Sequence, residues 1–109
     1  MATTVHNDIE ASFLVQNSAA VDPASLGAVA AANQDYAVKS MDGSDTAPLK
    51  SGDTIVVIPP ATLEAGITIQ GAVYKNDSTV TVRFTNGSAG AIDMASQAIG
   101  AWKFVVHRR

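Results

Sequence analysis

The sequence has no cysteine among its 109 residues, so neither disulfides nor thiolate metal sites can hold the fold together. Aromatic residues make up only 6% of the chain, and much of the 47% hydrophobic fraction is alanine, so bulky core residues are few. A chain of this size forms one domain with a modest core. We therefore expect self-association, or docking on a larger body, to supply additional burial.

Long apolar runs and clusters of positive charge are also missing. No segment approaches the roughly 20 apolar residues of a membrane-spanning helix, and Asp8 and Glu10 stand where a secretory signal needs positive charge. The net charge is −3, and the terminal pair Arg108 and Arg109 is the only run of basic residues. Because phosphate neutralisation needs clustered Lys and Arg, we expect no nucleic-acid partner and no membrane partner, and a soluble protein made in a cytosol.

No arrangement of residues indicates catalysis or metal binding. His6 and His107 lie near opposite ends of the chain, without carboxylates at ligand spacing, and no Gly-x-Ser-x-Gly motif marks a nucleophile. Residues 42–45 (DGSD) resemble part of a calcium loop, but an Asx turn explains them better. We predict no catalytic, cofactor or metal site and no enzymatic activity, and a hydrolase is the weakest alternative.

Residues 66–85 carry the clearest structural signal, because two alternating segments flank a polar turn at residues 75–78. This pattern is typical of a half-buried β-hairpin. In the first segment the alternation places Ile67, Ile69, Gly71 and Val73 on one face. In the second it places Val80, Val82 and Phe84 on one face. We expect Gly71 to mark a β-bulge or a close approach of two backbones.

Further short strands are predicted at residues 36–41, 54–58 and 102–107, with Gly and Pro between them. The continuous apolar run at 54–58 favours a strand covered on both faces. In the last segment Trp102, Phe104 and Val106 face the core. Short strands at short spacing predict an all-β fold, a small antiparallel β-sandwich of jelly-roll type. We find no internal repeat.

Residues 1–33 differ from the rest because they are small or polar, with one apolar cluster. We predict an extended N-terminal arm or edge strand over residues 1–33, followed by the sandwich domain over residues 34–109. Deletion of the residues before Ala19 should then leave the sandwich folded. The predicted anchors of this arm on a partner are Ile9, Phe13, Leu14 and Val15.

The block 52–106 resembles small virion structural proteins of tailed bacteriophages. The resemblance rests on the segments GD (52–53), IVVIPP (55–60), LEAG (63–66), GAV (71–73), VRFTN (82–86), AGAID (89–93) and WKFVV (102–106), with GAVAAAN (27–33) as a lead-in. It implies a β-sandwich carried on the virion, as a capsid decoration (cement) protein or as part of a fibre. The stretch before residue 27 has no counterpart in that pattern and would be specific to docking.

The resemblance implies a protein that is made in the bacterial host cytoplasm and carried on the capsid surface. Its partner would be the major capsid protein, which it would stabilise by bridging subunits of the assembled head. We expect a homotrimer, with a dimer as the alternative, and no cofactor. The rival function is a receptor- or glycan-binding module of a fibre or spike, with loops 42–51 and 86–90 as the binding elements.

Overall fold

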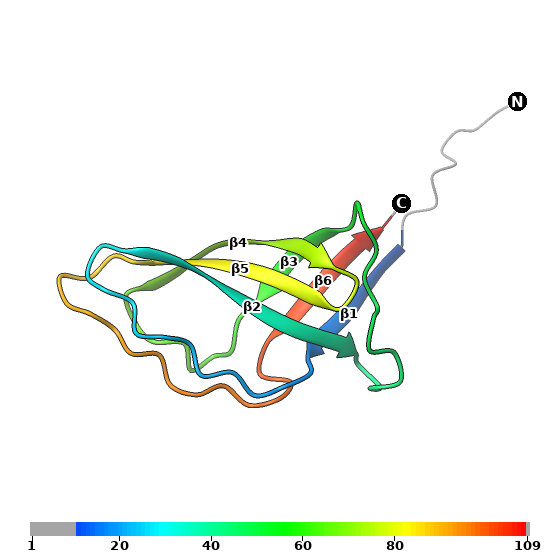
Figure 1. The fold of residues 1–109 in the computed structure, drawn as a ribbon, viewed down its shortest axis with the longest axis horizontal. Coiled ribbons are helices and arrows are strands. Elements are labelled where there is room, and N and C mark those ends of the chain that lie inside the picture. The colour runs from blue at the N-terminus through cyan, green and yellow to red at the C-terminus, as the bar shows by residue number, and fades with distance from the viewer. Residues whose placement is uncertain (1–10, 109) are drawn as a thin grey trace, which may run out of the picture.

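The computed structural model describes residues 11–108, which form six antiparallel strands in one sheet (Figure 1). The order of the strands across the sheet is β3-β6-β1-β2-β5-β4. Their bounds are β1 Ala11–Asn17, β2 Ala31–Ser40, β3 Thr54–Ile58, β4 Ile67–Asn76, β5 Thr79–Asn86 and β6 Lys103–Arg108. No helix occurs between residues 11 and 108. The prediction of an all-β antiparallel fold is confirmed.

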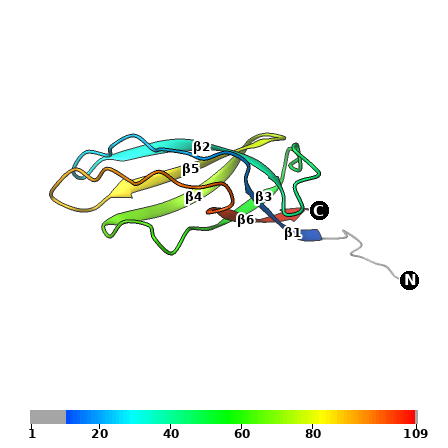
Figure 2. The same cartoon turned by 90° about the horizontal axis from the view of Figure 1, so that it is seen from below.

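The sheet rolls up into two layers, with β3, β6 and β1 on one side and β2, β5 and β4 on the other (Figure 2). The layers remain one continuous sheet because β1 pairs with β2 through Val15–Ser40 and Asn17–Val38. The two edge strands, β3 and β4, approach each other on the far side, so the roll is nearly closed. A sandwich of two separate sheets was expected, whereas here one sheet supplies both layers.

The core lies between the two layers around Trp102, whose side chain is fully buried. Its ring lies 5.0 Å from that of Tyr36 and 5.7 Å from that of Phe84, measured between centroids. Phe104 and Val106 point the same way from β6 and are also fully buried, so the alternation predicted for the last strand is confirmed. Aromatic side chains bury large areas, which compensates for their small number.

The predicted hairpin is formed by β4 and β5, and Gly71 lies at a bulge as expected. The register shifts between Ile69 and Gly71, where Gly71 has a φ of 146°, a backbone conformation that favours glycine. The extra residue reverses the alternation after it. Ala72 and Tyr74 therefore pack toward the core while Val73 is exposed, which corrects the predicted faces in that half of β4.

The prediction that residues 54–58 are covered on both faces is wrong. β3 is an edge strand, and only Ile55 and Val57 point toward the core. Val56 and Ile58 lie on the outer face of the sheet and are 50% and 44% exposed. A continuous apolar run therefore marks here a strand that has an apolar outer face.

The arm predicted for residues 1–33 is not observed from residue 11 onward, because β1 lies inside the sheet between β6 and β2. Val15 is fully buried in the core. Deleting the residues before Ala19 would remove an interior strand, so that truncation should unfold the sheet. The predicted boundary at residues 33/34 falls within β2. Ile9 lies outside the described residues.

An internal repeat, which sequence inspection missed, relates the long loops after β1 and after β5. Residues 20–30 (AVDPASLGAVA) and 91–101 (AIDMASQAIGA) share the pattern Ala-(Val/Ile)-Asp-x-Ala-Ser and the same succession of buried and exposed positions up to residues 28 and 99. The two loops run side by side (Figure 1). They are joined by two antiparallel β-bridges, Val21 with Gln97 and Leu26 with Ile92. Val21 is the counterpart of Ile92 and Leu26 that of Gln97, so the repeat maps each bridge onto the other.

Two buried asparagines at the strand ends hold these loops in equivalent ways. Asn17, at the end of β1, donates from Nδ2 to the carbonyl of Ala98 (2.9 Å). Asn86, at the end of β5, donates to the carbonyl of Gly27 (3.2 Å), the counterpart of Ala98. The two loops are therefore related by a pseudo-twofold axis.

Candidate docking surface

The outer face of β3, β6 and β1 is built from three rows of side chains that cross the strands. Pairing aligns Leu14 with Val105 and Val105 with Val56, so an apolar row crosses all three strands. The rows on either side are Ser12–His107–Thr54 and Gln16–Lys103–Ile58. Ile58 ends one of these neighbouring rows, and we refer to the four apolar residues of this face, Leu14, Val56, Ile58 and Val105, together as the apolar row.

The apolar row is open to solvent, since Leu14 is 40% exposed and Val56 and Ile58 are about as open. The polar residues around it are tied to the fold. The amide of Gln16 donates to the carbonyl of Met41 (3.1 Å), and Lys103 donates to that of Gly100 (2.9 Å). An apolar centre with a polar rim is the composition of a protein-binding surface.

The outer face of the other layer is polar and satisfies itself. Asp35 of β2 accepts from Lys75 of β4 and from the hydroxyl of Thr81 (2.7 Å). Arg83 donates to Gln70 and to Asn33, both at 3.3 Å. These polar side chains are thus paired with one another. Val73 is the one exposed large hydrophobic residue that β2, β5 and β4 carry. The two layers therefore present chemically different faces to solvent.

The predicted anchors divide between the two sides of β1. Leu14 points outward and belongs to the apolar row, whereas Val15 is buried and cannot contact a partner. Phe13 also points inward, and the guanidinium of Arg108 lies 4.9 Å from the centre of its ring. Of the three predicted anchors that the structure describes, only Leu14 lies on the outer face, and its role as an anchor stays a prediction. The structure adds Val56, Ile58 and Val105, which strand pairing places beside Leu14 and which sequence reasoning missed.

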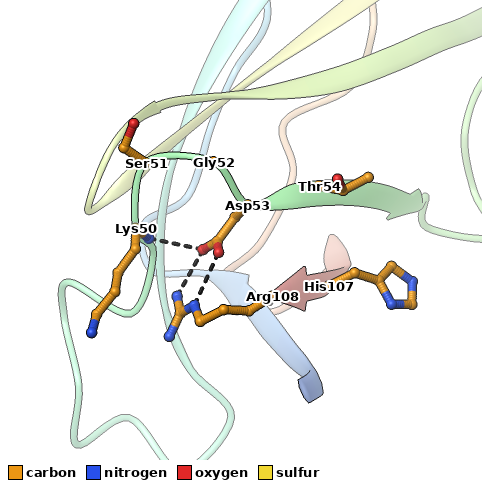
Figure 3. A pocket seen from close by; sticks show the side chains of 7 residues that line it. All are labelled: Lys50, Ser51, Gly52, Asp53, Thr54, His107 and Arg108. Atoms are coloured by element: carbon orange, nitrogen blue, oxygen red, sulfur yellow. Dashed lines mark hydrogen bonds and ion pairs between the residues drawn. The ribbon is translucent and has the colours of Figure 1, made fainter. Parts of the chain in front are cut away.

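The largest hollows include one of about 460 Å³ below the apolar row, where β3 begins and β6 ends (Figure 3). Arg108 donates to both carboxylate oxygens of Asp53, at 2.7 and 2.9 Å, and to the carbonyl of Pro48. Asp53 also accepts from the N–H of Lys50. The side chains of Lys50 and His107 point away from this ion pair in opposite directions (Figure 3).

The electrostatics of that hollow are those of a structural clamp. The hydrogen bonds from Arg108 hold the pKa of Asp53 below its usual range, and Asp53 raises the pKa of Arg108. Both groups stay charged and occupied by each other. His107 forms a 2.8 Å hydrogen bond with Ser12 across the strands. Asp53 and Arg108 are thus already paired with each other, and His107 is paired with the hydroxyl of Ser12.

Asp42 forms the Asx turn expected for residues 42–45. Its Oδ1 accepts from the hydroxyl of Ser40 and from the N–H and hydroxyl of Ser44, at 2.6 to 2.9 Å. These bonds lower the pKa of Asp42 to about 2. Across residues 11–108 no three His, Asp or Glu side chains cluster in a way that could hold a metal ion.

The two loops of the rival binding hypothesis lie at opposite ends of the roll. Loop 42–51 follows β2, and loop 86–90 begins at the last residue of β5. β2 and β5 are antiparallel, and Ala31 at the start of β2 lies opposite Thr85 near the end of β5. The last residues of the two strands therefore lie at opposite ends of the roll (Figure 1). The two loops cannot form one receptor- or glycan-binding site within a single copy.

Comparisons of the chain with protein-family models, with curated proteins and with solved structures found no match. The part of the chain that the structure describes contains no helix long and apolar enough to cross a membrane.

Proposed function

We propose that this protein is a structural binding protein that docks on a larger protein assembly through its apolar row. The observation that carries the proposal is the contrast between the two layers. One outer face exposes Leu14, Val56 and Ile58 together, and the other is neutralised by its own ion pair and hydrogen bonds. Burial of the apolar row on a partner would contribute about 25 cal/mol for each Å² removed from water.

The partner follows from the resemblance to tailed-phage virion proteins, and we propose the major capsid protein. In this role the protein is a decoration protein on the outer surface of the head. A protein that binds the assembled shell more tightly than its separate subunits stabilises the shell by mass action. Repetition over many equivalent positions makes a modest contact area sufficient.

Two matched substitutions on the two edge strands test the proposal. Val56→Asp places a charge in the apolar row, and Val73→Asp places the same charge on the polar layer, at a residue that is similarly exposed. We expect Val56→Asp to weaken co-sedimentation with purified heads at least about tenfold, because a buried unpaired carboxylate costs more than the corresponding 1.4 kcal/mol. Val73→Asp should bind as the wild type does.

Circular dichroism spectra and thermal midpoints of both variants control for unfolding. If both variants bind equally well, or if the wild-type protein is absent from purified virions, the proposal fails.

A further inference from the structure

A hollow lies beside each loop of the internal repeat, and three counterpart positions line both. One is lined by Ala95, Ser96 and Gln97, and the other by their counterparts Ala24, Ser25 and Leu26. The first is covered by the connection from β3 to β4, whose residues 60 and 62–64 line it. There a carboxylate oxygen of Glu64 accepts a hydrogen bond from the N–H of Ala95 (2.9 Å).

No residue of the β3–β4 connection lines the second hollow, and the repeat contains no counterpart of that connection. The remaining walls of this hollow are Pro23, residues 32–34 of β2 and the buried side chains of Phe84 and Met94, and its volume is about 60 Å³. This is room for a carboxyl group, since on the same measure a cavity holds one water molecule at about 10–15 Å³. No hydrogen bond joins the N–H of Ala24 to another of residues 11–108.

The first hollow shows which chemistry suits the second one. A backbone N–H paired with a carboxylate is a charge-assisted hydrogen bond, which is stronger than a neutral one. Asp22 beside the second hollow does not oppose this, because its counterpart Asp93 stands in the same place in the loop that Glu64 binds. The second hollow therefore fits a Glu side chain from an extended segment.

The chain contains one other segment of the required kind. Its only glutamates are Glu10 and Glu64, and each stands between a large aliphatic residue and an alanine, as Ile9-Glu10-Ala11 and Leu63-Glu64-Ala65. We propose that Glu10 of a second copy of this chain binds the N–H of Ala24, as Glu64 binds that of Ala95 within one copy.

Strand register excludes Glu10 of the same copy. Six residues of β1 separate Ala11 from Asn17, which pairs with Val38 of β2. Because the strands are antiparallel, the four residues of β2 from Val38 back to Gln34 continue in the same direction away from Ala11. At about 3.3 Å per residue, ten residues separate Ala11 from the hollow by roughly 30 Å. Glu10 is the neighbour of Ala11 in the chain, so it cannot span this distance.

A contact between the start of β1 in one copy and the loop 20–30 of the next joins two different surfaces, so it is heterologous. Such contacts close into rings or continue as filaments. The proposed contact uses none of the four residues of the apolar row, so this inference does not depend on the proposed capsid partner.

Sedimentation velocity of the full chain over a range of concentrations tests the inference. We expect reversible self-association that Glu10→Gln weakens about tenfold or more. Asp8→Asn, which removes the same charge two residues earlier, is the matched control and should associate as the wild type does. Val56→Asp should also associate normally, so this inference and the proposed function fail separately.

A second measurement locates the contact. The peptide VHNDIEA, which copies residues 5–11, is added at millimolar concentration to ¹⁵N-labelled Glu10→Gln protein. The amide signals of Ala24 and Ser25 should shift, and the peptide with Gln in place of Glu should not shift them. A monomeric wild-type protein, equal effects of Asp8→Asn and Glu10→Gln, or unchanged signals at Ala24 would each overturn the inference.

Discussion

The ion pair of Asp53 and Arg108 joins the start of β3 to the end of β6, and Asp53→Asn removes its charge with little change of shape. The side chain of Asp53 is only 2% exposed and that of Arg108 is 27% exposed. Hydrogen bonds to charged groups contribute about 1.5–3 kcal/mol each. Because Asn still accepts one bond and Arg108 can turn partly to solvent, we expect a loss of about 2 kcal/mol in the free energy of unfolding. For a domain of this size that lowers the Tm by about 8–16 °C.

The loss should depend on pH in a defined direction. Arg108 holds the pKa of Asp53 in the folded protein below its value in the unfolded chain. The ion pair therefore contributes its full stability above the unfolded pKa of about 3.9, and loses it as the pH falls through the lower folded value. Urea denaturation of the wild type and of Asp53→Asn between pH 7 and pH 2.5 should show the two curves converging at acid pH.

Asp35→Asn is the matched control, because the pair of Asp35 and Lys75 is exposed on both sides. Exposed pairs contribute at most about 1 kcal/mol. If Asp35→Asn destabilises the protein as much as Asp53→Asn does, or if the difference between wild type and Asp53→Asn stays constant down to pH 2.5, the clamp at Asp53 is refuted.

Two further substitutions test the paired loops. Val29 has a φ of 53° and is 80% exposed, whereas its counterpart in the repeat is Gly100. A left-handed backbone costs an L-residue about 1–2 kcal/mol. After the conformational entropy of glycine in the unfolded chain is subtracted, Val29→Gly should stabilise the protein by about 0.5–1 kcal/mol. A lower urea midpoint would contradict this. Gln97→Leu removes the oxygen that accepts from the hydroxyl of Tyr36 (2.8 Å) and from Nε1–H of Trp102 (2.6 Å). Leaving two buried donors unpaired should cost about 2–4 kcal/mol, measured by tryptophan fluorescence during urea unfolding, and a loss below 1 kcal/mol would show that water replaces Gln97.

The strands that sequence reasoning located correctly are those whose alternation is carried by large residues. Val80, Val82 and Phe84 in β5, and Trp102, Phe104 and Val106 in β6, are buried as predicted. β4 shows the limit of that reasoning. Gly71 indicated a bulge, but a bulge reverses every later side chain, and no property of the sequence said which residue was the extra one.

The candidate surface was less predictable because it depends on pairing between distant strands. Leu14 was selected as an arm residue, yet it reaches the surface because β1 pairs with β6 and places it beside Val105. Three consecutive apolar residues, Phe13 to Val15, conceal the alternation of β1, so the sequence did not indicate which of them faces outward. The repeat was hidden because small residues dominate it. The spacing also differs, because Asn86 lies two residues farther before its copy of the pattern than Asn17 lies before the other copy.

The pairing of β1 with β6 has a consequence for how the chain folds. Ala11 lies opposite Arg108, so the first and last strands are neighbours although the whole intervening chain separates them. Contacts of such high sequence separation are slow to form, because the entropy of closing a long loop opposes them. Folding should therefore be slow for so small a protein. A circular permutant that links these adjacent ends, and opens the chain elsewhere, should acquire its native structure much sooner.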